Sequence, residues 1–274
     1  MKITFKFAIL DKMKVRLTIL TQFLIQMTLV HSQTPTLVTG STVVAIRTPS
    51  EIYVGADSKL VAYGKDKKIE LSICKIRQVD NLFFAQTGLV GDAAGGFNVA
   101  ETVIKAHKHG DSISATVQAF EKMVVGPLTT MLQQFKRDQP DFYKKDLQRD
   151  SHFSIIFFGL ENGTVVVYSR YFTATDPING SSKIEIQRKD CPGDCPKGMT
   201  YIFLGEQEAM NKFLDANPHY SKIGWAPTIR KLIEIEIADK PDFVGYPIDI
   251  IRLNNKVTEW IQRKAECPDI QMRK

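Results

Sequence analysis

Strand-like and helix-like hydrophobic patterns occupy separate, successive runs of this chain, and that order restricts the folds open to it. Short apolar runs at Val43 to Arg47 and Ile52 to Ala56, separated by Thr48-Pro49-Ser50, predict a β-hairpin. A second hairpin is predicted from Ile69 to Val79 and from Leu82 to Thr87, joined by an Asp-Asn turn. This part of the chain therefore predicts antiparallel strands.

Helical spacing replaces the strand pattern after Gly88. Apolar residues recur every three or four positions from Phe97 to Ile104 and again from Ile113 to Val124, which predicts two helices. The second helix can continue to Phe135, although Gly126-Pro127 should kink or restart it, because proline has no backbone donor.

The remaining elements repeat this segregation of strands and helices. Strands are predicted at Phe153 to Phe158, Thr164 to Tyr171, Ile184 to Gln187, Tyr201 to Leu204 and Ile248 to Leu253; helices at Glu206 to Leu214, at Thr228 to Ile237 and in a mixed-charge tail around Trp260. Segregated runs of this kind predict α+β packing, not alternating parallel units. We expect two antiparallel sheets between helical layers, a four-layer αββα sandwich, in one domain over residues 41–274.

Composition places the chain with globular proteins and argues against nucleic-acid binding. Its 274 residues are 43% hydrophobic and 24% charged, which allows one sizeable core. The formal net charge is +6, but the 36 basic residues are interspersed with 30 acidic ones, and no stretch interleaves basic with aromatic side chains. We therefore expect no nucleic-acid partner.

Residues 1–32 have the pattern of an export signal. Lys12, Lys14 and Arg16 precede a mostly apolar stretch, Leu17 to Val30, that is too short and too rich in Thr and Gln to span a bilayer. The alternative is an ordinary N-terminal helix. The signal predicts a secreted or periplasmic protein without a stable membrane span, whereas the alternative predicts a cytoplasmic one.

Four cysteines fit an oxidising compartment. Cys191 and Cys195 bracket Pro-Gly-Asp, a turn sequence that could bring two sulfur atoms within bonding distance. Neither Cys74 nor Cys267 has a neighbour at the spacing of zinc ligands, and Cys74 lies in an apolar strand pattern, which favours a buried thiol. We expect neither a metal nor a cofactor.

One set of motifs points to catalysis. In Gly40 to Ile46, with the sequence GSTVVAI, a serine directly follows a glycine. Asp57 ends the second predicted strand, Lys75 lies in Cys-Lys-Ile, and Gly88 lies in Thr-Gly-Leu-Val-Gly-Asp. From about Gly40 to Leu253, these motifs and the element order resemble the proteasome β subunits and their bacterial relatives, a family of N-terminal-nucleophile hydrolases.

The resemblance implies a role for each of these residues. Removal of the segment before Ser41, with residues 33–40 as a short propeptide, would free the α-amine of Ser41. Such an amine has a pKa of about 7.7 to 8.0 and can take the proton of the hydroxyl. Lys75 would favour the neutral amine, and Asp57 would hold Lys75. The Gly88 amide would stabilise the oxyanion that forms on the attacked carbonyl.

The chain departs from the family at several positions. Ser41 replaces the usual threonine, a workable change that removes the methyl group which helps to restrict the hydroxyl rotamer. A later family aspartate is matched by Asp242, but the serine expected three residues beyond it is Gly245, and the serine of another loop is Glu206. A carboxylate near the amine would change the local charge, so these departures weaken the expectation of activity more than that of the fold.

Three functions follow from these observations. The first is a proteasome-like peptidase with a peptide substrate, and the second is an amidase for small amides. The third is a catalytically silent protein of the same fold that acts in assembly or binding, and the resemblance also allows a homo-oligomer. Taken singly, each residue also has a structural explanation: Ser41 as a turn serine, Asp57 as a strand-end aspartate, Lys75 as a solvent-facing lysine, and Gly88 as part of a helix-capping loop.

Overall fold

The computed structural model describes residues 37–40, 42–63, 68–92, 96–144, 152–175 and 183–267. These residues belong to one structural unit, Thr36–Lys274. The predicted signal segment, residues 1–32, the first part of the predicted propeptide, and Ser41 lie outside the described residues.

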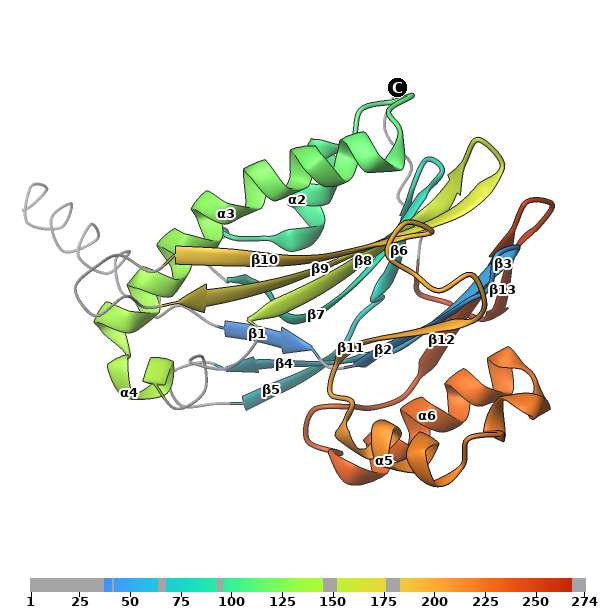
Figure 1. Ribbon diagram of the computed structural model, residues 1–274. Coiled ribbons are helices and arrows are strands. Elements are labelled where there is room, and N and C mark those ends of the chain that lie inside the picture. The colour runs from blue at the N-terminus through green and yellow to red at the C-terminus, as the bar shows by residue number, and fades with distance from the viewer. Residues whose placement is uncertain are drawn as a thin grey trace, which may run out of the picture. The chain divides into compact units, whose positions relative to one another are not determined.

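The smaller sheet contains the first predicted hairpin and is antiparallel throughout (Figure 1). In the described part of the chain it has five strands, in the order β11-β2-β3-β12-β13. These are β2 (Thr42–Arg47), β3 (Glu51–Asp57), β11 (Thr200–Gly205), β12 (Ile248–Asn254) and β13 (Thr258–Gln262). All six residues of β2 are buried, because both faces of this sheet are covered.

The larger sheet has eight strands among the described residues, with the order β10-β9-β8-β7-β1-β4-β5 and with β6 also paired to β7. Its strands are β1 (Leu37–Gly40), β4 (Lys59–Tyr63), β5 (Lys68–Ser72), β6 (Ile76–Val79), β7 (Leu82–Asp92), β8 (Phe153–Glu161), β9 (Thr164–Thr175) and β10 (Lys183–Cys191). All of its pairs are antiparallel, as the sequence predicts.

Two strand predictions need correction. The run from Ile69 to Val79 is not one strand, because β5 pairs with β4 whereas β6 pairs with β7, and the chain must leave one ladder before it joins the other. The tail around Trp260 is strand β13 and not a helix, since its residues extend the edge of the smaller sheet by pairing with β12. Strands β1 and β4 are additional to the predicted elements.

One group of helices packs on the larger sheet, and a second group packs on the smaller sheet (Figure 1). They are α2 (Val99–Ala106), α3 (Ile113–Asp138) and the short α4 (Pro140–Phe142), followed later by α5 (Glu208–Ala216), the 3-10 helix η2 (Tyr220–Ile223) and α6 (Trp225–Asp239). Side chains of Asn98 and Ser112 cap α2 and α3. Helix α3 continues through Pro127 and does not restart there. Proline lacks the backbone N–H that would bond to the carbonyl oxygen of Met123, and this loss is tolerated because Met123 lies on an exposed turn of the helix.

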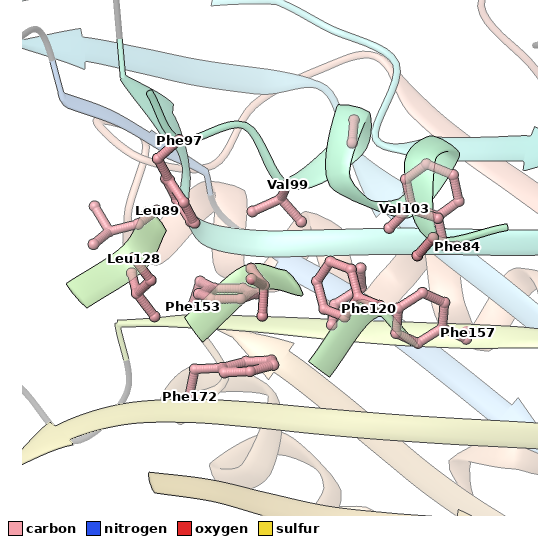
Figure 2. Close-up of a cluster of buried hydrophobic side chains, with 14 of the residues drawn as sticks. Phe84, Leu89, Phe97, Val99, Val103, Phe120, Leu128, Phe153, Phe157 and Phe172 are labelled. Carbon is pink, nitrogen blue, oxygen red and sulfur yellow. The ribbon is translucent and has the colours of Figure 1, made fainter. Parts of the chain in front are cut away.

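Buried phenylalanines fill the space between α3 and the larger sheet. Figure 2 shows Phe120 of α3 beside Phe157, and Phe153 lying flat on Phe172. The ring centroids are 5.2 Å apart in the first pair and 4.2 Å apart in the second. Aromatic pairs of this kind each add about 0.5 to 1.5 kcal/mol to the energy of burial. This cluster holds α2 and α3 on the sheet.

Two further hydrophobic clusters complete the core. One combines side chains of both sheets, such as Val54 and Ile251 from the smaller sheet with Phe83 and Ile156 from the larger one. The other joins β2 and β12 to α5 and α6 through Met210 and its neighbours. The structure is thus a mixed α+β arrangement of antiparallel sheets and helices. Within the described residues, no helix is both long and apolar enough to cross a membrane.

Candidate active site

The carboxylate of Asp57 is the centre of the candidate site. Asp57 ends β3 and is fully buried. Its Oδ1 accepts the backbone amide of Thr42 at 3.0 Å and the ammonium of Lys75. Its Oδ2 accepts the amides of Lys59 at 3.0 Å and Gly245 at 3.1 Å. Four donors therefore satisfy one buried negative charge, which is the condition under which such a charge is tolerated.

Lys75 is buried beside Asp57, although it lies outside the regular strands. Only 2% of its surface is exposed, which excludes a solvent-facing lysine. Burial lowers the pKa of Lys75, and the charge of Asp57 opposes this effect, while the nearby ammonium of Lys264 adds to it. The site therefore contains a lysine whose proton is held less tightly than usual.

Gly88 lies opposite Gly40 in the larger sheet. Strand β1 runs antiparallel between β7 and β4, and Gly40 pairs with Gly88 on one side and with Leu60 on the other. Gly88 has φ +77°, and a Cβ atom there would lie 2.5 Å from the carbonyl oxygen of His152. Only glycine fits, since both the backbone angle and the space exclude a side chain.

The chain changes sheets between Gly40 and Thr42. Gly40 is the last residue of β1 in the larger sheet, and Thr42 is the first of β2 in the smaller one. The Thr42 hydroxyl donates to the carbonyl oxygen of Glu206 at 3.0 Å. Both the main chain and the side chain of Thr42 are thus held, directly after the predicted nucleophile.

Glu206 and Gly245, which stand where the resemblance leads us to expect serines, also lie close to this centre. The carboxylate of Glu206 forms a 2.5 Å ion pair with Lys240, whose pKa is raised mainly by this hydrogen bond. Gly245 contributes its backbone amide to Asp57, and a Cβ atom there would lie 3.0 Å from the Lys59 side chain. Neither residue has the hydroxyl that the resemblance leads us to expect at these two positions.

Asp242 is placed differently from the other predicted site residues. It lies in the segment between α6 and β12, and its side chain is exposed. This segment is anchored by its backbone: the Lys59 ammonium donates to the Pro241 carbonyl at 2.7 Å, and the Ser58 amide donates to that of Gly245 at 3.1 Å. The segment therefore joins the site through main-chain atoms of Pro241 and Gly245, while Asp242 itself is an exposed residue.

Both pairs of cysteines form disulfides. The predicted Cys191–Cys195 bond is present. The prediction of a free buried thiol at Cys74 is wrong, because Cys74 is bonded to Cys267. The two cysteines are 193 positions apart in sequence, so local spacing carried no signal. The even number of cysteines was the available signal, since one local pair leaves these two.

The structure thus brings together some of the predicted site residues. Asp57, Lys75 and the backbone of Thr42 form one connected group. Gly88 of β7 lies opposite Gly40, the last residue of β1 and the residue before Ser41. A surface hollow lined by Tyr220, Arg230 and other residues of η2, α6 and β13 involves none of them.

Comparison with known proteins gives a likeness at the level of structure only. The sequence matches no protein-family model and no curated protein. Among solved structures, the Anbu complex of Pseudomonas aeruginosa, described as a helical assembly, is 15% identical, with 82% of this chain and 88% of that chain covered and a TM-score of 0.48.

Two further solved structures have similarly low sequence identity to this chain, and their TM-scores are also below 0.5. Anbu, an ancestral β subunit, from Yersinia bercovieri is 13% identical, with 81% of this chain and 87% of that chain covered and a TM-score of 0.46. Eukaryotic HslV from Trypanosoma brucei is 16% identical, with 78% and 99% covered and a TM-score of 0.39.

Proposed function

We propose that this chain is a proteasome-like hydrolase that uses Ser41 as an N-terminal nucleophile to cleave peptide or amide bonds. One observation carries the proposal. The Asp57 carboxylate binds both the buried Lys75 ammonium and the amide of Thr42, so the cation is tied to the residue directly after Ser41. A buried cation with a lowered pKa, held on the carboxylate that also binds the residue after a serine, suits the activation of a nucleophile.

The proposed reaction begins with hydrolysis of the Gly40–Ser41 bond, which leaves a carboxylate on Gly40 and a free amine on Ser41. The neutral amine takes the proton of the Ser41 hydroxyl as the oxygen attacks the substrate carbonyl. The charge of Lys75 favours the neutral amine. The amine then returns the proton to the leaving nitrogen, and water hydrolyses the ester on Ser41.

The pairing of β1 supports an extended substrate. Gly40 lies opposite Gly88, so the residue before Ser41 is paired with the glycine that the resemblance assigns to the oxyanion. Once β1 has left, the edges of β7 and β4 would accept a peptide strand by main-chain hydrogen bonds. One donor to the oxyanion is typically worth about 2.7 to 4 kcal/mol.

A second candidate is a catalytically silent protein of the same fold. It is favoured by Glu206 and Gly245, which supply no hydroxyl, and by the exposed side chain of Asp242. Under this candidate, the chain would stay uncut before Ser41 and act in assembly or binding. The expected homo-oligomer also stays a prediction, and light scattering on the purified protein tests it.

The experiment that separates the two candidates is mass spectrometry of the purified chain, followed by hydrolysis assays on peptide and acyl-amide libraries. The enzyme proposal expects a chain that begins at Ser41. It also expects Ser41→Ala to remove both the cleavage and the hydrolysis, whereas the exposed Ser50→Ala leaves them unchanged. A chain that retains Gly40 under all conditions contradicts the enzyme and supports the silent protein.

We also propose a secreted or periplasmic location and a four-layer αββα arrangement. The two disulfides support the first, because such bonds persist in oxidising compartments. The three hydrophobic clusters support the second, since one lies between the sheets and the others lie under helices. Cell fractionation tests the location, and an experimental structure tests the layers.

A further inference from the structure

A disulfide joins the residue before Lys75 to the C-terminal part of the chain. Cys74 is bonded to Cys267, with their Cα atoms 5.5 Å apart, and Cys267 is 6% exposed. Because Cys74 and Lys75 share a peptide bond, a constraint on Cys74 also restricts the backbone of Lys75.

The linker that carries Lys75 lies outside the hydrogen-bond ladders of the larger sheet. Residues Ile73, Cys74 and Lys75 lie between β5 and β6, outside both ladders. The Ile73 amide donates to the carbonyl oxygen of Ser58 at 2.9 Å, and Arg77 Nε donates to that of Cys74 at 3.1 Å. The linker is therefore held by individual hydrogen bonds and by the disulfide, and not by strand pairing. The disulfide matters more here than it would within a regular strand.

The other end of the disulfide is anchored to the smaller sheet. After β13 the chain makes a turn in which the Cys267 amide donates to the carbonyl oxygen of Lys264 at 3.1 Å. The Lys264 amide donates to Oδ1 of Asp249 at 2.7 Å, and Asp249 is a buried residue of β12. The Lys264 ammonium also contacts Ser72 Oγ at 2.9 Å, next to the linker. The turn is thus fixed on β12 and reaches the linker.

These contacts form a closed ring of linked residues that includes the ion pair. In the β3–β12 ladder, Asp249 lies opposite Ala56, the residue before Asp57. From Asp57 the ring runs through this ladder to Asp249, then through the turn and the disulfide to Cys74. It closes where Lys75 binds Asp57. The disulfide therefore fixes the lysine relative to the strand that carries its partner.

We propose that the Cys74–Cys267 disulfide is a positioning element of the candidate active site, and this inference rests on the function proposed above. It holds the linker so that the Lys75 ammonium stays on Asp57, whose carboxylate also binds the amide of Thr42. Opening of this bond frees the linker and slows catalysis, while the folded structure is retained. The Cys191–Cys195 bond at the end of β10 is outside the ring and has no such role.

The test compares two double variants, Cys74→Ser/Cys267→Ser and Cys191→Ser/Cys195→Ser. Misplacement of a catalytic group by about 1 Å can cost up to roughly a hundred-fold in rate. The first variant should lower kcat about ten- to hundred-fold, with KM nearly unchanged because β4 and β7 are intact. The second should retain the wild-type kcat.

A second readout follows Lys75 itself. In protein labelled with 15N-lysine, the Lys75 ammonium signal is assigned by its loss in Lys75→Arg. We expect this signal to shift or broaden in the Cys74→Ser/Cys267→Ser variant alone. The same signal and the same kcat in both variants, with circular dichroism showing folded protein, would overturn the proposal.

The two readouts separate this inference from the proposed function. If the wild-type chain has no hydrolytic activity, the proposed function fails, and the Lys75 signal alone then decides whether the disulfide positions the lysine.

If the Cys74→Ser/Cys267→Ser variant does not fold, the folded Cys191→Ser/Cys195→Ser protein is treated with dithiothreitol. This dithiol gives two electrons and two protons to the remaining disulfide and becomes a cyclic disulfide. A Lys75 signal that is unchanged while free thiols accumulate overturns the proposal, whereas a shift in step with the thiols supports it.

Discussion

Oδ1 of Asp57 accepts the amide of Thr42 at 3.0 Å and also contacts the ammonium of Lys75. One oxygen atom thereby links the start of β2 to a lysine that lies far along the chain. Because the group is buried, the strength of this link is not reduced by solvent as in a surface ion pair.

Loss of either partner of the buried pair should be costly. Lys75→Met leaves Asp57 buried without its cation, and we expect a loss of the order of 3 kcal/mol in the free energy of unfolding. Asp57→Asn/Lys75→Met should lose less than the sum of the single changes, by about 0.5 to 3 kcal/mol, because the two side chains interact. Urea unfolding measures the cycle. Additive single changes would contradict the coupling. Lys105→Met is the control, because it breaks an exposed ion pair with Glu101 and should change the free energy of unfolding little.

Gly88→Ala should cost more than a glycine substitution at the same backbone angle elsewhere. Gly163 has the same φ of +77° but no atom within 4 Å of an added Cβ, whereas at Gly88 the His152 carbonyl is 2.5 Å away. We expect Gly163→Ala to lose about 1 to 2 kcal/mol from the angle alone. Gly88→Ala should lose clearly more, together with any hydrolytic activity. Equal losses in thermal or urea unfolding would show that the chain relaxes around the new methyl group.

The carboxyl group of Glu236 should make stability depend on pH. Glu236 is buried in α6 and accepts the Met210 amide at 2.8 Å, and burial raises its pKa. The folded state therefore binds this proton more tightly than the unfolded state, where the pKa is about 4.3.

This stabilisation is complete below about pH 4.3 and is lost as the pH rises through the raised folded pKa. Relative to the wild type, Glu236→Gln should gain stability over that range, because glutamine resembles the protonated form at every pH. Urea unfolding from pH 3 to 8 measures the difference, and a difference that is constant with pH would exclude this role.

Lys264→Gln should raise the pKa of Lys75. The Lys264 ammonium disfavours a second positive charge, so its removal makes the protonated form of Lys75 easier to keep. NMR titration of 15N-labelled lysine measures the direction of the change. The exposed Lys256→Gln should leave the titration unaltered, and a lower Lys75 pKa in Lys264→Gln would contradict the assigned charge effect.

Several elements could be predicted from the sequence because their signals are local. The hairpin at Thr48-Pro49-Ser50 follows from turn chemistry, and the helices from Phe97 to Val124 follow from the spacing of apolar residues. The tail around Trp260 was misassigned, because its strand is stabilised by pairing with β12 and its own pattern is ambiguous.

The residue types of the candidate site follow from the sequence, since the motifs around Asp57, Lys75 and Gly88 are local. The resemblance also led us to expect that Asp57 holds Lys75, but the burial of this pair and the exposed position of Asp242 became visible only in the folded chain. The tertiary structure also decided that Cys74 pairs with Cys267. Contacts between distant segments depend on which strands pair and how the two sheets pack. The local pattern of side chains does not determine either of these.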